Sequence, residues 1–245
     1  MAQDRPLYNT IAALGNVHAL TELVERLRAC PATLPRLGVF HGNSGFGKTT
    51  AAIYAANVFG AAHVQCKSYW TKKTLTEAIL AELGATPGKT ISTQVDQICE
   101  RLAVGDLPLI VDEADFLVSG RKIEIVRDIY EGSGAPVVLI GEELLPQRLT
   151  AWERVHGRVL SWVAAMPAAA SDVDHLCPIY ARGIDIDADM RAQLLKASHG
   201  SVRRICVNLN RIAEFARTRG LAAVDLDIWG DEGFYTGEAP RPRGL

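Results

Sequence analysis

The sequence predicts an α/β fold, in which a parallel five-stranded sheet is flanked by helices and followed by a small helical domain. Two observations predict this fold. Short apolar runs alternate with helical patterns up to about residue 165, and a glycine-rich loop joins the first such run to the next helix. The 245 residues suffice for one large domain with a small satellite. We therefore expect an α/β core over 1–168, a helical lid domain over 169–228 and an irregular C-terminal tail over 229–245.

The elements are expected in a regular order along the chain. The five expected strands are the apolar runs Leu37–His41, Ala62–Cys66, Leu107–Val111, Pro136–Ile140 and Val159–Ala164. Helical patterns cover about 16–29, 48–58, 74–83, 92–102 and 121–131. After Pro167 no further strand is expected, and 171–180, 187–198 and 201–218 are expected to be helices.

Composition excludes several classes of protein. Hydrophobic residues make up 48% of the chain and charged residues 22%, which rules out a disordered protein. The net charge of -2 means that any surface for nucleic acid must be a local patch. The five cysteines are widely spaced without a C-x-x-C pair, which favours free thiols over disulfides or a zinc site. Neither a signal peptide nor a run of 18 apolar residues is visible, so we expect a cytoplasmic protein without a membrane partner.

The glycine-rich loop predicts a nucleotide site. It fits G-x-x-x-x-G-K-[ST] between a strand and a helix, as the motif requires. Its backbone N–H groups and the helix N-terminus are suited to phosphate, while Lys48 would bridge the β- and γ-phosphates and the Thr49 hydroxyl would bind Mg²⁺. We therefore predict ATP and Mg²⁺ as cofactors, held by Gly42, Asn43, Ser44, Gly45, Phe46, Gly47, Lys48, Thr49 and Thr50.

A second motif is the apolar run that ends in two carboxylates, Asp112 and Glu113. The end of a buried parallel strand lies at the carboxyl edge of the sheet, beside the phosphate loop. Asp112 would hold Mg²⁺ through its water shell, and Glu113 would accept a proton from the attacking water. The letters DEAD at 112–115 do not indicate a DEAD-box helicase, because such helicases need two α/β domains of this kind.

With these motifs, the chain resembles the P-loop AAA+ ATPases, and within them the transposition ATPases of the phage Mu B family. The resemblance covers about residues 10–220 and includes the stretches LPQRLTAWERVHGRV and GSVRRICVNLNRIAEFA. It implies an ATPase that forms rings or helical filaments on duplex DNA without strong sequence preference and presents this DNA to a transposase. The Mu B protein has an N-terminal helix-turn-helix domain, whereas only about 36 residues precede the first expected strand here.

The resemblance also assigns roles to arginines. Arg203, three residues after Gly200, matches the second sensor that touches the γ-phosphate, with Arg204 as the alternative. Arg158 matches the arginine finger that acts on the ATP of a neighbouring subunit, with Arg154 as the alternative. Glu142 stands where the class has a small polar first sensor, so either the sensor is shifted or hydrolysis is slow.

Two basic segments are candidates for DNA contact. Lys67, Thr71, Lys72 and Lys73 surround the start of an expected helix, and Arg121 and Lys122 form a second spot. The alternative is an ordinary solvated helix start, with Trp70 packed in the core.

Three functions remain open from the sequence. The first is an ATP-dependent, sequence-nonspecific DNA-binding ATPase that selects target DNA and activates a transposase. The second is a helicase loader or replication-initiation ATPase. The third is an ATP-switched signalling or secretion regulator that does not bind DNA.

Overall fold

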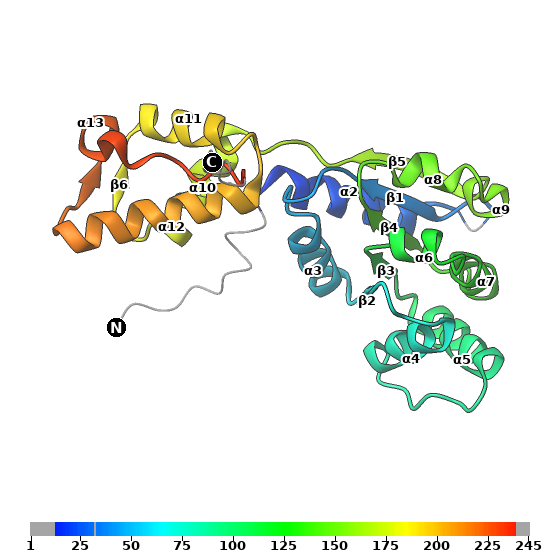
Figure 1. Ribbon diagram of the computed structural model, residues 1–245. Coiled ribbons are helices and arrows are strands. Elements are labelled where there is room, and N and C mark those ends of the chain that lie inside the picture. Colours follow the sequence, from blue (N-terminus) through cyan, green and yellow to red (C-terminus); the bar gives the residue numbers. More distant parts are fainter. Residues whose placement is uncertain (1–12, 32, 239–245) are drawn as a thin grey trace, which may run out of the picture. The chain divides into compact units, whose positions relative to one another are not determined.

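A computed structural model of the protein describes residues 13–31 and 33–238 (Figure 1). The chain divides into two compact units. Of the described residues, the sheet unit comprises those within 17–43 and 48–165, and the helical unit comprises 13–16, 44–47 and 166–238. The main division therefore falls between Ala165 and Met166, close to the expected domain boundary at 168, while the tip of the glycine-rich loop groups with the helical unit.

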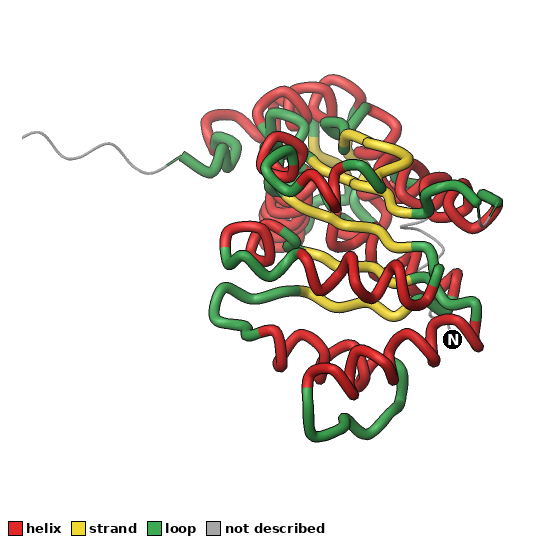
Figure 2. Tube along the Cα trace, turned by 90° about the vertical axis from the view of Figure 1, so that its right-hand side faces the viewer, coloured by secondary structure: helices red, strands yellow, loops and turns green. Residues whose placement is uncertain are grey.

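The sheet unit is built on a five-stranded sheet of order β2-β3-β4-β1-β5, in which every neighbouring pair is parallel. Figure 2 shows these strands side by side, flanked by helices. The predicted fold class is therefore confirmed. Two strands have their predicted bounds and three are shifted by one or two residues: β1 (Leu37–His41), β2 (Ala62–Gln65), β3 (Leu109–Asp112), β4 (Val137–Gly141) and β5 (Val159–Ala164).

Eight helices accompany this sheet among the described residues. The expected helix over 121–131 instead covers Glu124–Ser133. It starts later because the chain first forms a short helix, Asp115–Ser119, and then turns at Arg121, which has a φ of 53°. Two further short helices were not expected, since one turn is too short to show a periodic pattern. The eight are α2 (Gly15–Ala29), α3 (Lys48–Phe59), α4 (Lys72–Glu82), α5 (Ile91–Gly105), α6 (Asp115–Ser119), α7 (Glu124–Ser133), α8 (Leu145–Leu149) and α9 (Glu153–His156).

The core of the sheet unit is apolar and closely packed. All residues of β3 and β4 are buried, as expected for inner strands of a parallel sheet covered on both faces. On β1, Gly38 lets α2 approach closely: a Cβ there would lie 2.9 Å from side-chain carbons of Leu23 and Leu27. The packing therefore fixes the carboxyl ends of the inner strands, and Asp112 of the acidic motif stands at the end of β3.

The helical unit contains three longer helices, as predicted, but the expectation of no strand after Pro167 was wrong. β6 (Asp185–Ile186) and β7 (Ala223–Val224) pair in parallel, and strands of two residues are too short to show alternation. α12 buries an apolar stripe that includes Ile205, Leu209 and Ile212. The helices are α10 (Ala170–Tyr180), α11 (Ala188–Ala197), α12 (Val202–Arg219) and α13 (Leu226–Trp229), followed by the 3-10 turn η1 (Gly230–Glu232).

The C-terminal tail has no regular element over 233–238, and this part is attached to α12, while the expectation for residues 239–245 lies outside the described residues. Asn208, which is 1% exposed, accepts from the N–H of Tyr235 at 2.7 Å and donates to the carbonyl of Tyr235 at 3.0 Å. The Trp229 ring lies 5.0 Å from that of Phe215 and 5.8 Å from that of Phe234. These contacts make the chain through Tyr235 part of the helical unit. No helix in the described ranges is long and apolar enough to cross a bilayer.

Candidate functional site

The glycine-rich loop runs from the end of β1 to the start of α3, as the phosphate-loop motif requires. Gly45 has a φ of 87° and Gly47 a φ of 84°, a backbone region that residues with a Cβ rarely adopt. Glycine is therefore needed at both positions for the loop to curl and turn its N–H groups toward a phosphate.

Within the helical unit, the tip of this loop accepts two hydrogen bonds, one from a backbone N–H and one from a side-chain amide. The carbonyl of Gly45 accepts a 3.1 Å hydrogen bond from the backbone N–H of Arg203, in the first turn of α12. The amide of the buried Asn16 donates to the carbonyl of Phe46 at 2.8 Å. A Cβ on Gly45 would lie 2.5 Å from the hydroxyl oxygen of Ser201, so this glycine also permits the close approach of α12.

Lys48 is the first residue of α3, and its Nζ is turned back onto the loop. It donates to the carbonyls of Gly42 at 2.6 Å and Asn43 at 2.9 Å. Burial lowers the pKa of Lys48, and the nearby carboxylates, first of all Glu113, oppose this shift. The ammonium group is therefore partly desolvated and available to exchange backbone carbonyls for phosphate oxygens.

Thr49 and Asp112, the two residues predicted to bind Mg²⁺, are in direct contact. The hydroxyl of Thr49 donates to Oδ2 of Asp112 at 2.8 Å, and Asp112 is 2% exposed at the end of β3. A hydroxyl and a carboxylate are the hard oxygen ligands that Mg²⁺ prefers, so the residues fit the predicted ion. Among the described residues, no group of three or more His, Cys, Asp or Glu side chains could hold a metal ion.

Glu113 follows Asp112 in a strained backbone conformation with a φ of 55°. Its N–H donates to Oδ1 of Asp112 at 2.8 Å, which holds this turn at the strand end. Burial, followed by the negative charge of Asp112, raises the pKa of Glu113 above its ordinary value. A carboxylate with a raised pKa is a stronger base, which suits the predicted role of proton acceptor.

The next carboxylate, Asp115, was not predicted to have a role. It is 6% exposed, it accepts from the backbone N–H of Glu142 at 2.7 Å, and it forms an ion pair with Arg148 at 2.9 Å. The only signal in the sequence is its place as the fourth letter of the acidic run. Glu142 itself has an exposed side chain, and its negative charge contributes to raising the pKa of Glu113, after burial and Asp112.

The two sensor candidates on α12 have different surroundings. The side chain of Arg203 is exposed, while that of Arg204 is half-buried against the tail. A Cβ on Gly237 would lie 2.8 Å from Nε of Arg204, so the Arg204 guanidinium packs on this glycine. Arg203 is the residue whose side chain remains accessible, and its role as second sensor stays a prediction.

The two finger candidates also differ. Arg158 forms an ion pair with Glu131 of α7 and donates to the carbonyl of Arg154 at 2.5 Å. Within the described residues, the exposed side chain of Arg154 has no hydrogen bond or ion pair. Arg158 would therefore need to leave Glu131 in order to act on a neighbouring subunit.

The structure brings the two predicted basic segments together. Nζ of Lys122 donates a hydrogen bond to the carbonyl of Trp70, so the Lys122 turn lies directly beside the segment that leads into α4. Trp70 is half-buried and packs against the apolar core. Lys67 and Arg121 are exposed on these two segments. The two segments are called the basic surface below, with Lys67, Thr71, Lys72, Lys73, Arg121 and Lys122 as its residues.

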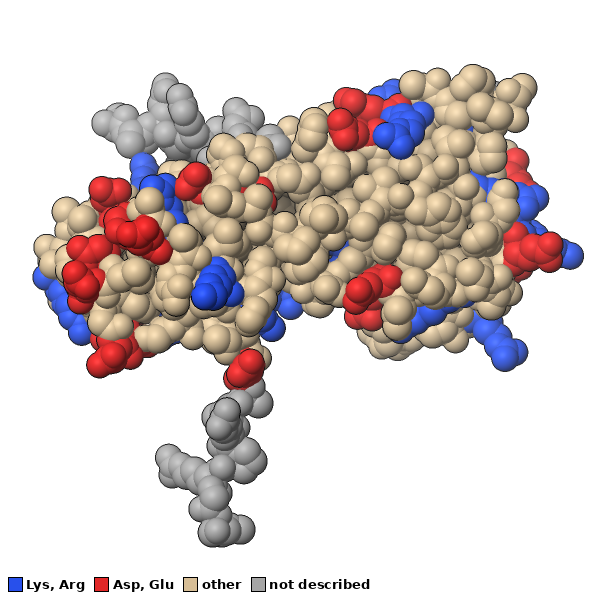
Figure 3. Space-filling view, turned by 90° about the horizontal axis from the view of Figure 1, so that it is seen from above, with Lys and Arg blue, Asp and Glu red and all other residues tan. Residues whose placement is uncertain are grey.

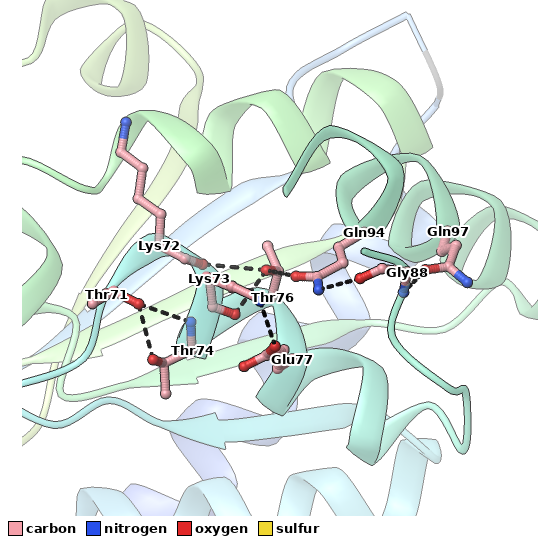
Figure 4. A network of polar contacts seen from close by, with 9 residues as sticks. All are labelled: Thr71, Lys72, Lys73, Thr74, Thr76, Glu77, Gly88, Gln94 and Gln97. Atoms are coloured by element: carbon pink, nitrogen blue, oxygen red, sulfur yellow. Dashed lines mark hydrogen bonds and ion pairs between the residues drawn. The ribbon is translucent and has the colours of Figure 1, made fainter. Parts of the chain in front are cut away.

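Figure 4 shows how the start of α4 is held. Thr71 caps the helix by accepting from the N–H of Thr74 at 3.1 Å, and Lys73 forms an ion pair with Glu77 at 3.7 Å. The fully buried Thr76 bonds to the carbonyl of Lys73 at 2.9 Å and to Gln94 of α5 at 2.5 Å. The Lys72 side chain points away from this network.

Charge is mixed on the face of the molecule that Figure 3 draws. On the face drawn in Figure 3, Lys and Arg side chains stand among Asp and Glu side chains without a single basic field. This pattern accords with the net charge of -2. A polyanion would therefore have to be bound by a local cluster.

Comparison with protein families gives one match. Residues 32–149 match the model of a family described as an AAA domain. A search of the curated proteins gave no match.

Several solved structures share the fold. The Aeropyrum pernix ORC1 protein in complex with DNA is 19% identical, with a TM-score of 0.64 over 87% of this chain and 62% of that one. The ADP form of the Aeropyrum pernix ORC2 protein is 17% identical, with a TM-score of 0.62 over 87% of this chain and 66% of that one. A Thermotoga maritima RuvB mutant is 16% identical, with a TM-score of 0.60 over 88% of this chain and 68% of that one.

The chain thus spans less than two thirds of the length of the two ORC proteins. At these identities the likeness concerns the fold. Together with the strand order, it shows that this chain has the α/β fold of a P-loop AAA+ core, within which residues 32–149 are similar to an AAA domain.

Proposed function

We propose that the protein binds ATP with Mg²⁺ at the glycine-rich loop and hydrolyses it. The observation that carries this proposal is the 2.8 Å bond between Thr49 and Asp112, with Lys48 in the same loop and Glu113 next along the chain. These residues supply a cation ligand pair, a phosphate-binding ammonium and a base, which are the groups that phosphoryl transfer to water needs.

Each side chain has a defined task in this reaction. Lys48 exchanges the carbonyls of Gly42 and Asn43 for oxygens of the β- and γ-phosphates. Glu113 orients the attacking water and takes its proton. Mg²⁺, when bound, neutralises phosphate charge, and Thr49 and Asp112 are the residues that would hold it.

The loop from Gly42 through Thr49, together with Thr50, contributes backbone and side-chain contacts to the phosphates. Arg203 is assigned the role of second sensor, and Arg158 that of a finger for the adjacent subunit of a ring or filament. The bond from the N–H of Arg203 to Gly45 supports the first assignment, because it attaches the start of α12 to the loop that holds the phosphates.

The second part of the proposal is that duplex DNA binds to the basic surface without strong sequence preference. Support comes from the Lys122–Trp70 bond, which unites two basic segments, and from the capped start of α4 in the same surface. Phosphate contacts from lysines and from backbone near a helix start carry no base information, so such binding would be insensitive to sequence. One protein of similar fold is described in complex with DNA.

Two purposes for this DNA binding are favoured by different observations. The resemblance to the Mu B family favours delivery of target DNA to a transposase and its activation. The fold likeness to ORC1 and ORC2 favours the second candidate, a helicase loader or replication-initiation ATPase.

ATP turnover with and without duplex DNA tests the core of the proposal. We expect turnover that depends on Mg²⁺ and rises with DNA of any sequence, and no turnover for Lys48→Ala. ATP turnover at the same rate with and without DNA would instead support the third function, an ATP-switched signalling or secretion regulator that does not bind DNA. Affinity capture with Glu113→Gln loaded with ATP, followed by identification of the bound protein, separates a transposase from a replicative helicase.

A further inference from the structure

One peptide group connects the glycine-rich loop to the acidic motif. This group joins Gly141, the last residue of β4, to Glu142. Its carbonyl accepts a 3.3 Å hydrogen bond from the N–H of Gly42, and its N–H donates a 2.7 Å hydrogen bond to Oδ2 of Asp115. Because both bonds use the same peptide group, the Asp115 carboxylate and the first residue of the loop are attached to opposite ends of a single dipole.

The contact depends on the glycine at position 141. A Cβ there would lie 2.2 Å from Oδ2 of Asp115 and 2.6 Å from a side-chain carbon of Leu145, which is closer than atoms can approach. Gly141 therefore gives the carboxylate access to the backbone of the next residue. Hydrogen bonds in such a chain strengthen one another, so the Asp115 charge also makes the Gly141 carbonyl a better acceptor for Gly42.

The Asp115 side chain is itself held in place. It is 6% exposed, and its other oxygen accepts from Nη1 of Arg148 in α8 at 2.9 Å. A buried carboxylate needs such partners, because burying an unpaired charge is costly. Next to Asp115, the N–H of Ala114 donates to the carbonyl of Ile140 at 2.8 Å, which adds a backbone bond between the acidic turn and β4.

We propose that Asp115 is a positioning residue for ATP hydrolysis, which rests on the proposed function. It fixes the Gly141–Glu142 peptide between Gly42 of the loop and the acidic turn that carries Glu113, and Arg148 keeps Asp115 in this orientation. The spacing between the phosphates and the base thereby depends on a carboxylate that touches neither ATP nor water. A shift of about 1 Å in such a spacing can reduce the rate by about 100-fold.

Four variants test this role by separating ATP affinity from turnover. In Asp115→Asn, the amide nitrogen faces one of the two donors, the N–H of Glu142 or Nη1 of Arg148, and leaves that donor without an acceptor. In Gly141→Ala, the added Cβ displaces the Asp115 carboxylate. Both should lower kcat at least tenfold while the Kd for a fluorescent ATP analogue changes by less than about threefold, because Lys48 and the loop still hold the phosphates. Arg148→Ala should lower kcat in the same way. Arg148→Lys, which retains a donor for Asp115, should restore most of it.

The matched control is Arg182→Ala, which removes an exposed arginine of the helical unit and should leave kcat and Kd unchanged. If Asp115→Asn or Gly141→Ala does not fold, as judged by the thermal transition, the comparison of Arg148→Ala with Arg148→Lys decides.

The positioning role is overturned if Asp115→Asn folds and has the kcat of the parent protein. If Asp115→Asn does not fold, the role is overturned when Arg148→Ala has the parent kcat. An equal loss of ATP affinity and kcat overturns the role as well. Absence of ATP binding and turnover in the parent chain would instead overturn the proposed function itself.

Discussion

The hydroxyl of Thr49 donates a 2.8 Å hydrogen bond to Oδ2 of Asp112, although the two residues lie 63 positions apart in the chain. The bond joins the start of α3 to the end of β3 at the carboxyl edge of the sheet. Ligands bind at this edge in open α/β sheets, so the pair stands where a nucleotide is expected.

Replacement of Lys48 by alanine should remove the ammonium group that faces the phosphates. We expect ATP affinity to fall by about 100-fold or more, because charge-assisted bonds to phosphate are the strongest contacts of such a loop. Equilibrium titration with a fluorescent ATP analogue measures the change. Lys196→Ala, which removes an exposed lysine of α11, is the control and should bind like the parent. Unchanged affinity in Lys48→Ala would remove the basis for the phosphate site.

Replacement of Glu113 by glutamine should retain ATP binding and reduce turnover by about 100-fold, because an amide cannot accept the proton of water. Single-turnover hydrolysis with bound nucleotide measures the chemical step. Glu100→Gln, which changes an exposed carboxylate of α5, serves as the control. Hydrolysis at the parent rate in Glu113→Gln would show that another residue is the base.

The raised pKa of Glu113 also predicts how stability depends on pH. Burial and the charge of Asp112 raise this pKa in the folded protein, so the folded state holds a proton that the unfolded state has already released. Ionised Glu113 therefore lowers stability, and this loss develops as pH rises from the ordinary pKa through the raised one. Glu113→Gln should raise the Tm of the nucleotide-free protein at neutral pH. The difference should vanish at about pH 3, well below the ordinary pKa of about 4.3, because Glu113 is then protonated in both the folded and the unfolded state. If Glu113→Gln and the parent protein have the same Tm at neutral pH, the Glu113 carboxylate is not destabilised by burial.

Mixing two inactive variants tests whether Arg158 acts between subunits. Arg158→Ala should bind ATP but lose cooperative turnover, and Lys48→Ala subunits cannot bind ATP but still carry Arg158. A mixture should regain part of the parent activity if the arginine completes a neighbour's site. Glu131→Gln is informative as well, since it frees Arg158 from its ion pair within the chain. No recovery at any mixing ratio would count against a finger at this position.

Removal of Lys72 and Lys73 together should weaken DNA binding equally on unrelated sequences. Each lost phosphate contact should reduce the slope of log affinity against log salt by about one. Fluorescence anisotropy at several salt concentrations gives both quantities. Lys72→Ala alone should cause most of the effect, because Lys73 is already paired with Glu77. If the double variant keeps the parent affinity and slope, the DNA surface lies elsewhere.

Much of the fold could be predicted because its signals are local. β1 and β5 have their predicted bounds, and β1 is an apolar run of strand length between Arg36 and the glycine-rich loop. The loop from Gly42 was predictable because it needs glycines and a lysine at fixed spacing. β6 and β7 were missed because strands of two residues show no alternation, and their pairing joins residues far apart in sequence.

The contacts around the site were harder to predict. The sequence shows Asp115 only as one more carboxylate, and its bond to Glu142 arises because β3 and β4 lie side by side in the sheet. Similarly, the sequence presents Lys122 and Trp70 as separate segments, and only the folded chain brings them together. Long-range polar contacts of this kind have no periodic signature.

The pairing of Asn208 with Tyr235 determines where the chain can be shortened. A truncation at residue 228 looks reasonable from composition, because residues 229–245 are rich in glycine and charge. It would nevertheless leave the Asn208 amide without either of its Tyr235 bonds inside α12. An unpaired buried polar group costs about 1–3 kcal/mol. Truncations and affinity tags should therefore be placed after residue 238, beyond the last described contact of the tail with the helix.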